Sequence, residues 1–170
     1  MNNKIVYVPL AVDILHSGHL NIINRAKKYG KVVIGLLSDN AVAEYKNIPS
    51  LEYEERYKIV KNLKNVHKII KQDTWDYSKV LNSLKPDYFV HGDDWKKGIQ
   101  KKTRQKVIRL LKKNKGKLIE IPYTKNISSS SIKSDLINHL TPTSRVSILK
   151  RLIDSKKIVR ILESHSPLSG

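Results

Sequence analysis

The sequence of 170 residues contains no cysteine. This absence excludes disulfide bridges, thiolate zinc sites and cysteine nucleophiles. No stretch approaches the roughly 18 consecutive apolar residues that a membrane-spanning helix needs. The residues after Met1 lead into a strand-like segment instead of a signal peptide. We therefore expect a cytoplasmic protein that does not insert into a membrane.

Acidic residues are also scarce. There are 15 Asp and Glu against 33 Lys and Arg, which leaves a formal net charge of +18. Such an excess favours a polyanionic partner, either a nucleotide, a phosphorylated metabolite or a nucleic acid. A lysine-rich composition without functional meaning is the alternative. Apolar residues make up 39% of the chain, a share typical of a globular domain with a core.

Two kinds of segment alternate along most of the chain. Short apolar, β-branched runs typical of buried parallel strands occupy residues 4–8, 31–37, 66–70, 88–91 and 118–121. Helical spacing of apolar residues occupies residues 18–29, 52–63, 77–84 and a stretch around residues 107–111. The alternation predicts an α/β fold: a Rossmann-like, doubly wound, five-stranded parallel sheet flanked by helices. Ligands of such sheets bind beyond the carboxyl ends of the strands, where the strand order reverses.

The carboxyl-terminal part of the chain follows a different pattern. Serines occupy residues 128–131, and a further helix is predicted from Ile132 to Leu140. The segment 141–144 interrupts it, and another amphipathic helix and the strand-like residues 158–162 follow. We therefore expect two domains, residues 1–140 and residues 141–170.

The sharpest local signal is the segment Asp13-Ile14-Leu15-His16-Ser17-Gly18-His19, between the first strand and the first helix. Two histidines at a helix amino terminus, where backbone N–H groups are free to bind anions, can cradle phosphate oxygens. A zinc site would need a third ligand, and the remaining histidines have no recognisable ligand spacing. The alternative is that the two histidines only cap the helix.

This segment resembles the HxGH motif of the nucleotidyltransferase superfamily, and within it the cytidylyltransferases. Further motifs of that family are matched, in order, by Ser38-Asp39 with Tyr45-Lys46, Glu54-Glu55-Arg56, Gly92-Asp93-Asp94-Trp95 and Ile127-Ser128-Ser129-Ser130-Ser131-Ile132. The resemblance implies transfer of CMP from CTP to a phosphate or phosphonate oxygen, with release of pyrophosphate. The implied cofactor is Mg²⁺ carried by the triphosphate, with no metal site formed by the protein.

The resemblance also implies roles for individual residues. His16 and His19 would donate hydrogen bonds to the phosphates, and Lys46 would bridge the acceptor and the α-phosphate. Asp13 would join Lys46 in binding the acceptor. The implied nucleotide contacts are Leu10, Ala11, Gly18, Asp94, Trp95, Ile127, Ser128, Ser129 and Ser130. Alternatives exist: Lys46 as a surface lysine, Asp93 or Asp94 as a helix cap, and the serines as a linker.

Two departures from the family pattern concern the acceptor. Residues 10–13 read Leu-Ala-Val-Asp, without the glycine and threonine of the family's first loop. Residues 123–126 read Tyr-Thr-Lys-Asn, without the family's arginine, a charge that Lys125 could supply.

Residues 151–169, which include Glu163, His165, Leu168 and Ser169, are similar to the opening of phosphoenolpyruvate mutases. That similarity implies the amino-terminal part of a longer bifunctional protein of phosphonate biosynthesis. The alternative is an ordinary carboxyl-terminal helix and tail.

We therefore expect a homodimeric CTP:phosphonate cytidylyltransferase, acting on 2-hydroxyethylphosphonate or 2-aminoethylphosphonate. The enzyme alternative is a glycerol-3-phosphate or phosphocholine cytidylyltransferase. The non-enzyme alternative is a noncatalytic nucleotide- or nucleic-acid-binding module. Residues 96–117 form a basic strip that a nucleic acid could use. We do not expect a nucleic-acid partner, since anionic substrates already account for an attractive field.

Overall fold

The computed structural model describes residues 3–44, 49–96, 100–124 and 127–138. The chain divides into two units, Met1–Ser129 and Ser130–Gly170. The first unit contains the sheet. The boundary expected near Leu140, and the helix and strand expected after it, lie outside the described residues and stay predictions.

Five parallel strands form one sheet in the order β3-β2-β1-β4-β5. The strands are β1 (Ile5–Leu10), β2 (Lys31–Leu37), β3 (Val66–Gln72), β4 (Tyr88–Gly92) and β5 (Lys117–Ile121). The helices are α1 (Ser17–Ala26), α2 (Asp39–Ala43), α3 (Tyr53–Lys61), α4 (Ser78–Leu84), the 3₁₀ turn η1 (Asp93–Lys96), α5 (Lys101–Lys113) and α6 (Ser129–Asn138). The predicted Rossmann-like fold class is confirmed, whereas α2 and η1 were not predicted.

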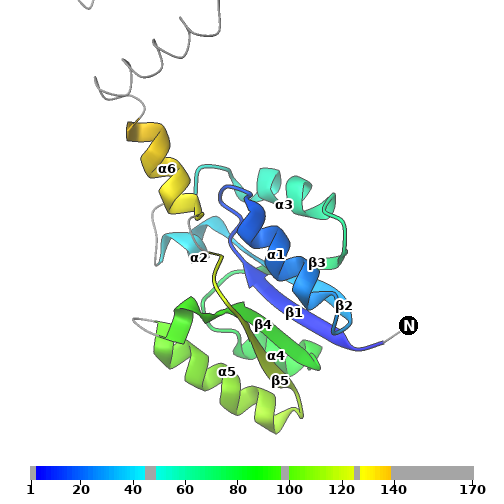
Figure 1. Ribbon diagram of the computed structural model, residues 1–170. Helices are drawn as coiled ribbons and strands as arrows, with labels where there is room; N and C mark the ends of the chain where they lie inside the picture. Colours follow the sequence, from blue (N-terminus) through cyan, green and yellow to red (C-terminus); the bar gives the residue numbers. More distant parts are fainter. Residues whose placement is uncertain (1–2, 45–48, 97–99, 125–126, 139–170) are drawn as a thin grey trace, which may run out of the picture. The chain divides into compact units, whose positions relative to one another are not determined.

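Helices cover both faces of the sheet (Figure 1). On one face, α1 and α3 pack against alternate strand residues, among them Val6, Val8 and Ile34. On the other face, α4 and α5 pack against the intervening residues, among them Tyr7, Val33 and Phe89. Because both faces are buried, the central strands are apolar at successive positions, as the continuous runs in the sequence predict.

A buried hydrogen-bond chain crosses the sheet beneath β2. The Tyr7 hydroxyl donates to Oε1 of Gln72 at 2.9 Å, and Nε2 of Gln72 donates to the carbonyl oxygen of Thr74 at 2.6 Å. Tyr7 lies on β1 and Gln72 on β3, so the chain passes Gly35 on β2. A Cβ atom at Gly35 would lie 1.8 Å from the Tyr7 hydroxyl oxygen, which means that only glycine leaves room for it.

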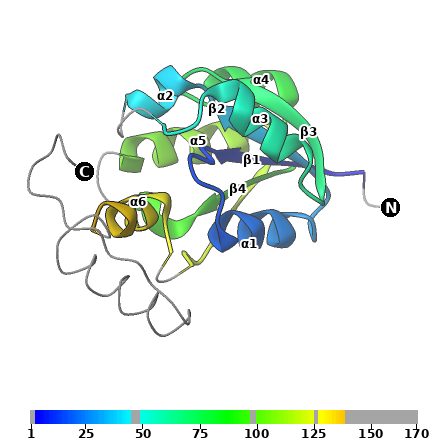
Figure 2. The same ribbon diagram turned by 90° about the horizontal axis from the view of Figure 1, so that it is seen from above.

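The strand order reverses between β1 and β4. The chain runs outward from β1 to β2 and β3, and then crosses to β4 on the other side of β1. Figure 2 shows α1 starting at the edge of the sheet where β1 ends and running back along the sheet. The loop that precedes α1 therefore lies at the topological switch point, where ligands of such folds bind.

Candidate functional site

Most of the predicted site residues lie on three loops at the carboxyl ends of adjacent strands. Residues 11–16 follow β1, the turn η1 follows β4, and residues 122–124 and 127–128 follow β5. Hydrogen bonds join these loops. An Asp93 carboxylate oxygen accepts from the Tyr123 backbone N–H at 2.9 Å, and the Ser129 hydroxyl accepts from the backbone N–H of Ile14 at 3.4 Å. The structure therefore brings together three of the segments that the sequence singles out.

Two histidines close the amino end of α1. Nδ1 of His16 accepts from the Gly18 backbone N–H at 3.1 Å, and Nδ1 of His19 accepts from the His16 backbone N–H at 3.4 Å. This arrangement is a capping box in which imidazoles replace the usual hydroxyl and carboxylate. Because an accepting ring nitrogen carries no proton, the neutral form of each imidazole holds its proton on Nε2.

The two imidazoles also lie against each other. Their ring centroids are 4.0 Å apart with an interplanar angle of 39°. A Cβ atom at Gly18 would lie 2.8 Å from Cε1 of His16, so glycine allows the His16 ring to fold over the helix end. The pair thus combines two Nε2–H donors with the amino terminus of a ten-residue helix. This is donor chemistry suited to phosphate oxygens.

The loop between β1 and α1 is held in a strained conformation. Val12 is 1% exposed and has a φ of 50°, a left-handed value that a β-branched residue rarely adopts. Such a conformation costs on the order of 1–3 kcal/mol and persists only where surrounding contacts impose it. One contact is next to it: an Asp13 carboxylate oxygen accepts from the Ser50 backbone N–H at 2.6 Å.

Arg56 supplies a further contact to this loop. Its side chain is fully buried, and its guanidinium donates to the carbonyl oxygens of Ala11 and Leu51 and to the Asp39 carboxylate at 2.6 Å. One side chain on α3 therefore joins the first loop, the start of α2 and the segment before α3. Arg56 belongs to the matched segment Glu54-Glu55-Arg56, but no role for it is predicted from the sequence.

Other predicted residues have varied surroundings. Leu10 ends β1 and is half-buried, as are Ala11, Ile127 and Ser128. Ser129 is engaged with both the N–H and the carbonyl oxygen of Ile14. Ser130 belongs to the second unit. Lys46 and Lys125 lie outside the described residues, so their predicted roles stay predictions.

The turn after β4 is tightly packed on one side and open on the other. The Trp95 indole is 1% exposed and stacks on His91 with centroids 3.9 Å apart, whereas the Asp94 side chain is 53% exposed. A ligand contact at Trp95 would therefore involve its backbone. Burial lowers the pKa of His91, so its imidazole remains neutral near neutral pH.

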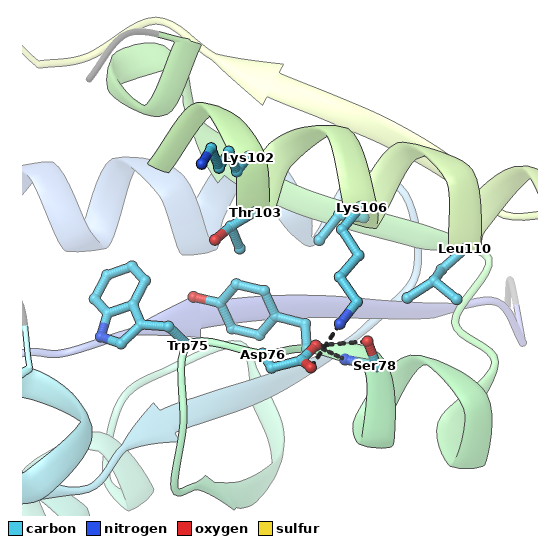
Figure 3. Close-up of a pocket in the computed structure, with 9 residues that line it drawn as sticks. Trp75, Asp76, Ser78, Lys102, Thr103, Lys106 and Leu110 are labelled. Carbon is cyan, nitrogen blue, oxygen red and sulfur yellow. Dashed lines mark hydrogen bonds and ion pairs between the residues drawn. The ribbon is translucent and has the colours of Figure 1, made fainter. Parts of the chain in front are cut away.

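A pocket of about 310 Å³ lies away from the histidine pair, between the segment before α4 and helix α5 (Figure 3). Its lining includes Trp75, Lys102, Thr103 and Leu110, and an ion pair between Asp76 and Lys106 at 2.7 Å crosses one side. None of the predicted site residues lines it. The pocket lies on the side of the sheet covered by α4 and α5, whereas the histidines begin α1 on the other side.

Within the described residues, no three His, Cys, Asp or Glu side chains lie together in an arrangement that could hold a metal ion. The donors around His16 and His19 are N–H groups, which bind anions and not hard cations. In the same part of the chain, every helix is too short or too polar to span a bilayer.

Comparison with known proteins matches residues 12–135 to the family described as cytidylyltransferase-like. An ethanolamine-phosphate cytidylyltransferase from Dictyostelium discoideum is 30% identical over 75% of this chain, which spans only 35% of that relative. A glycerol-3-phosphate cytidylyltransferase from Bacillus spizizenii is 29% identical over 73% of this chain and 90% of that relative. An FAD synthase from Archaeoglobus profundus is 35% identical over 48% of this chain and 53% of that relative.

Solved structures share the fold. A lipopolysaccharide core biosynthesis protein from Thermoplasma volcanium aligns with a TM-score of 0.60 at 23% identity, over 73% of this chain and 98% of that one. Pantothenate synthetase from Thermus thermophilus aligns with a TM-score of 0.52 at 14% identity, over 86% of this chain and 65% of that one.

Proposed function

Because the chain belongs to the cytidylyltransferase-like family, we propose that it transfers CMP from CTP to a small acceptor that bears a phosphate or phosphonate group. The observation that carries the proposal is the histidine pair at the amino end of α1. Its two Nδ1 atoms accept backbone hydrogen bonds, which leaves the proton of each neutral ring on Nε2. Donors of this kind stabilise the negative charge that develops during phosphoryl transfer.

The reaction needs no covalent enzyme intermediate. An acceptor oxygen forms a bond to the α-phosphorus of CTP, the bond from that phosphorus to the bridging oxygen breaks, and pyrophosphate leaves in line. The attacking oxygen is already ionised at neutral pH, so no general base has to remove a proton from it. Catalysis then depends on positioning and on stabilisation of the charge that moves to the leaving group. We assign that stabilisation to Nε2–H of His16 and of His19.

Mg²⁺ is the proposed cofactor, and the triphosphate would carry it. Bound there, the ion would neutralise phosphate charge and keep several water ligands. The N–H donors of the histidine pair are compatible with this arrangement, since they bind the phosphate oxygens and do not compete for the cation.

The remaining contacts with the substrates are proposed for residues of three further segments. The exposed Asp94 carboxylate can accept from the exocyclic amine of cytosine. Ser128 and Ser130 would bind the β- and γ-phosphates, and Ser129 would also hold the first loop through Ile14. Lys46 would bridge the acceptor and the α-phosphate.

For the acceptor we propose a small phosphonate, 2-hydroxyethylphosphonate or 2-aminoethylphosphonate. The support is the similarity of residues 151–169 to the opening of phosphoenolpyruvate mutases. Relatives named glycerol-3-phosphate and ethanolamine-phosphate cytidylyltransferase support phosphate monoesters as the competing acceptors. A homodimer is part of the same proposal.

An acceptor panel tests the proposal. The protein is incubated with CTP, Mg²⁺ and each phosphonate, glycerol 3-phosphate, phosphoethanolamine or phosphocholine, and pyrophosphate release is measured. A further arm contains ATP with flavin mononucleotide, because some relatives are FAD synthases. We expect release with CTP and a phosphonate. Release only with a phosphate monoester would replace the acceptor, and CTP binding without release from any acceptor would indicate a noncatalytic binding module.

A further inference from the structure

Glu120 occupies an unusual electrostatic position. It is the first acidic residue after Asp94 in the sequence, and residues 96–119 contain eleven Lys and Arg between them. Glu120 lies on β5 directly opposite His91 of β4 in the register of the sheet. Its side chain is 17% exposed, so the carboxylate is largely removed from water.

The Glu120 carboxylate joins three elements. Oε1 accepts from the indole N–H of Trp95 at 2.8 Å and from Nε of Arg104 at 2.8 Å, and Oε2 accepts from NH2 of Arg104 at 3.1 Å. The Lys96 ammonium lies 3.5 Å from Oε2. The turn η1 is thereby attached to β5 and α5 through one side chain. These donors hold the pKa of Glu120 at about 2, so it stays ionised at neutral pH.

Ring packing and this hydrogen bond fix Trp95 in complementary ways. The indole is nearly parallel to the His91 ring, at 9°, and to the Phe89 ring, at 2°. Stacking resists tilting of the indole, but allows it to slide or rotate within its plane. The directional hydrogen bond to Glu120 opposes that remaining motion.

The other residues of the turn are also held. Asp93 accepts from the Tyr123 backbone N–H, and the Asp94 side chain folds over Gly92, where an added Cβ atom would lie 2.7 Å from Oδ1 of Asp94. Asp94 is nevertheless the most exposed side chain among these contacts. The turn thus presents one carboxylate on a backbone that Glu120, Asp93 and the aromatic stack hold in place.

We propose that Glu120 is a positioning residue that sets nucleotide selectivity by holding η1, and with it Asp94, in a fixed place. The proposal rests on the proposed function, in which Asp94 accepts from the amine of cytosine. An acceptor distinguishes that amine from the carbonyl oxygen of uracil only if its place is fixed to within about 0.5 Å. A turn that can shift would let the Asp94 carboxylate move away from the uracil oxygen, so that both bases bind.

The kinetic test compares wild type with Glu120→Ala and Glu120→Gln, using CTP and UTP in turn. For Glu120→Ala we expect KM for CTP to rise about tenfold and the CTP-to-UTP ratio of kcat/KM to fall at least about tenfold. We expect kcat with saturating CTP to change by less than about threefold, because the histidine pair is untouched. Glu120→Gln keeps an oxygen that can accept from Trp95, so its ratio should lie between those of the other two.

Asp76→Asn is the matched control. Asp76 also pairs with a cation of α5, and its hydrogen bonds to Lys106 and Ser78 likewise hold its pKa at about 2. It lies at the pocket of Figure 3, and its carboxylate bonds to Lys106 and Ser78, which belong to α5 and α4 and not to η1. We expect Asp76→Asn to keep the wild-type nucleotide ratio.

Two further measurements test the role of Glu120 without requiring catalytic turnover. The chain has two tryptophans, so Trp95 can be followed by fluorescence in a Trp75→Phe background. Adding Glu120→Ala should shift the Trp95 emission to longer wavelength, as the indole gains access to water. Binding of CTP and UTP by calorimetry should show the same loss of discrimination, even if wild type releases no pyrophosphate and the proposed function fails.

The inference would be overturned by a Glu120→Ala protein that remains folded, as judged by circular dichroism, and keeps the wild-type ratio of CTP to UTP. An unchanged Trp95 emission would overturn it as well. If Glu120→Ala does not fold, Glu120→Gln with a wild-type nucleotide ratio and a shifted Trp95 emission would have the same meaning.

Discussion

Each histidine of the HSGH segment has two functions, divided between its two ring nitrogens. Nδ1 closes the amino end of α1, and Nε2–H is the donor proposed for the phosphates. The two alternatives drawn from the sequence, a helix cap and a phosphate cradle, are therefore compatible. A histidine in this geometry is fixed in the tautomer that the proposed chemistry requires.

Substitution of His16 can separate the two functions. We expect His16→Ala to lower kcat by roughly 10²–10³, the range for loss of one preorganised donor, and to lower the free energy of unfolding by about 1 kcal/mol through loss of the cap. His16→Asn keeps an oxygen that can accept from Gly18, so it should recover most of the stability but not kcat. The measurements are steady-state kinetics and urea denaturation. Near-wild-type kcat in either variant would contradict the proposed donor role.

The lowered pKa values of Glu120 and Asp76 predict acid sensitivity. In the folded state the pKa of each carboxyl is about 2, whereas the ordinary pKa that applies to the unfolded chain is 3.8 for Asp76 and 4.5 for Glu120. Their contribution to the free energy of unfolding should therefore be present above about pH 4.5, and it should be lost as the pH falls towards 2. Asp76 is half exposed, so solvent screening reduces its share. In urea titrations across this range, Glu120→Gln should show a shallower pH dependence than wild type, and identical slopes would refute the prediction.

At the scale of elements, the first loop depends on a helix that is distant in sequence. Arg56 of α3 contacts Ala11 from 45 positions away and ties α2 to the same point through Asp39. The strained Val12 is adjacent to this contact. The position of the histidine pair is thus connected, through the first loop, to the packing of α3.

Arg56→Met tests this connection. Loss of the guanidinium leaves carbonyl oxygens of Ala11 and Leu51 without their donor, so we expect the free energy of unfolding to fall by at least about 2 kcal/mol. Relaxation of the first loop should also lower kcat. The control is Lys58→Met, which removes an exposed ion pair with Glu55 from the same helix and should change neither quantity measurably. Equal effects of the two substitutions would show that α3 stability alone matters.

Most of the helices and strands could be predicted from the sequence, but the two shortest helical elements could not. All five strands and their covering helices were predicted, because buried strands and amphipathic helices leave apolar periodicities that survive in any window of the sequence. The helix α2 and the turn η1 have five and four residues, too few to show a period. They depend on local caps and distant contacts, such as the Ser38 hydroxyl at the start of α2 and the Trp75 indole donating to Ala41.

Some residues of the candidate site could also be predicted from the sequence, and others could not. The HSGH segment could be predicted because its residues are adjacent in sequence and their chemistry is local. Arg56 and Glu120 could not be assigned roles, because their partners lie 45 and 25 positions away, and only the folded sheet brings them together. The abundance of Lys and Arg is a second reason. Arg104 binds Glu120, but nothing in the sequence distinguishes it from the other basic residues around it.

At the scale of the whole molecule, the net charge of +18 should influence the encounter with CTP. A positive field raises the rate at which a polyanion arrives, and salt screens that field. We expect kcat/KM for CTP to fall at least about tenfold between about 50 and about 500 mM KCl, whereas kcat changes little. Sucrose of matched osmolality is the control. A kcat/KM that does not depend on salt would mean that the basic composition plays no part in substrate capture.

The glycine on β2 has a consequence for sequence variation among relatives. The absence of a side chain at Gly35 leaves room for the Tyr7 hydroxyl, which donates a hydrogen bond to Gln72. A single change of Gly35 to alanine would collide with that hydroxyl, whereas a smaller residue at position 7 would remove the reason for glycine. Positions 7, 35 and 72 should therefore change together during divergence. In an alignment of relatives, a side chain at position 35 should be accompanied by loss of the tyrosine at position 7.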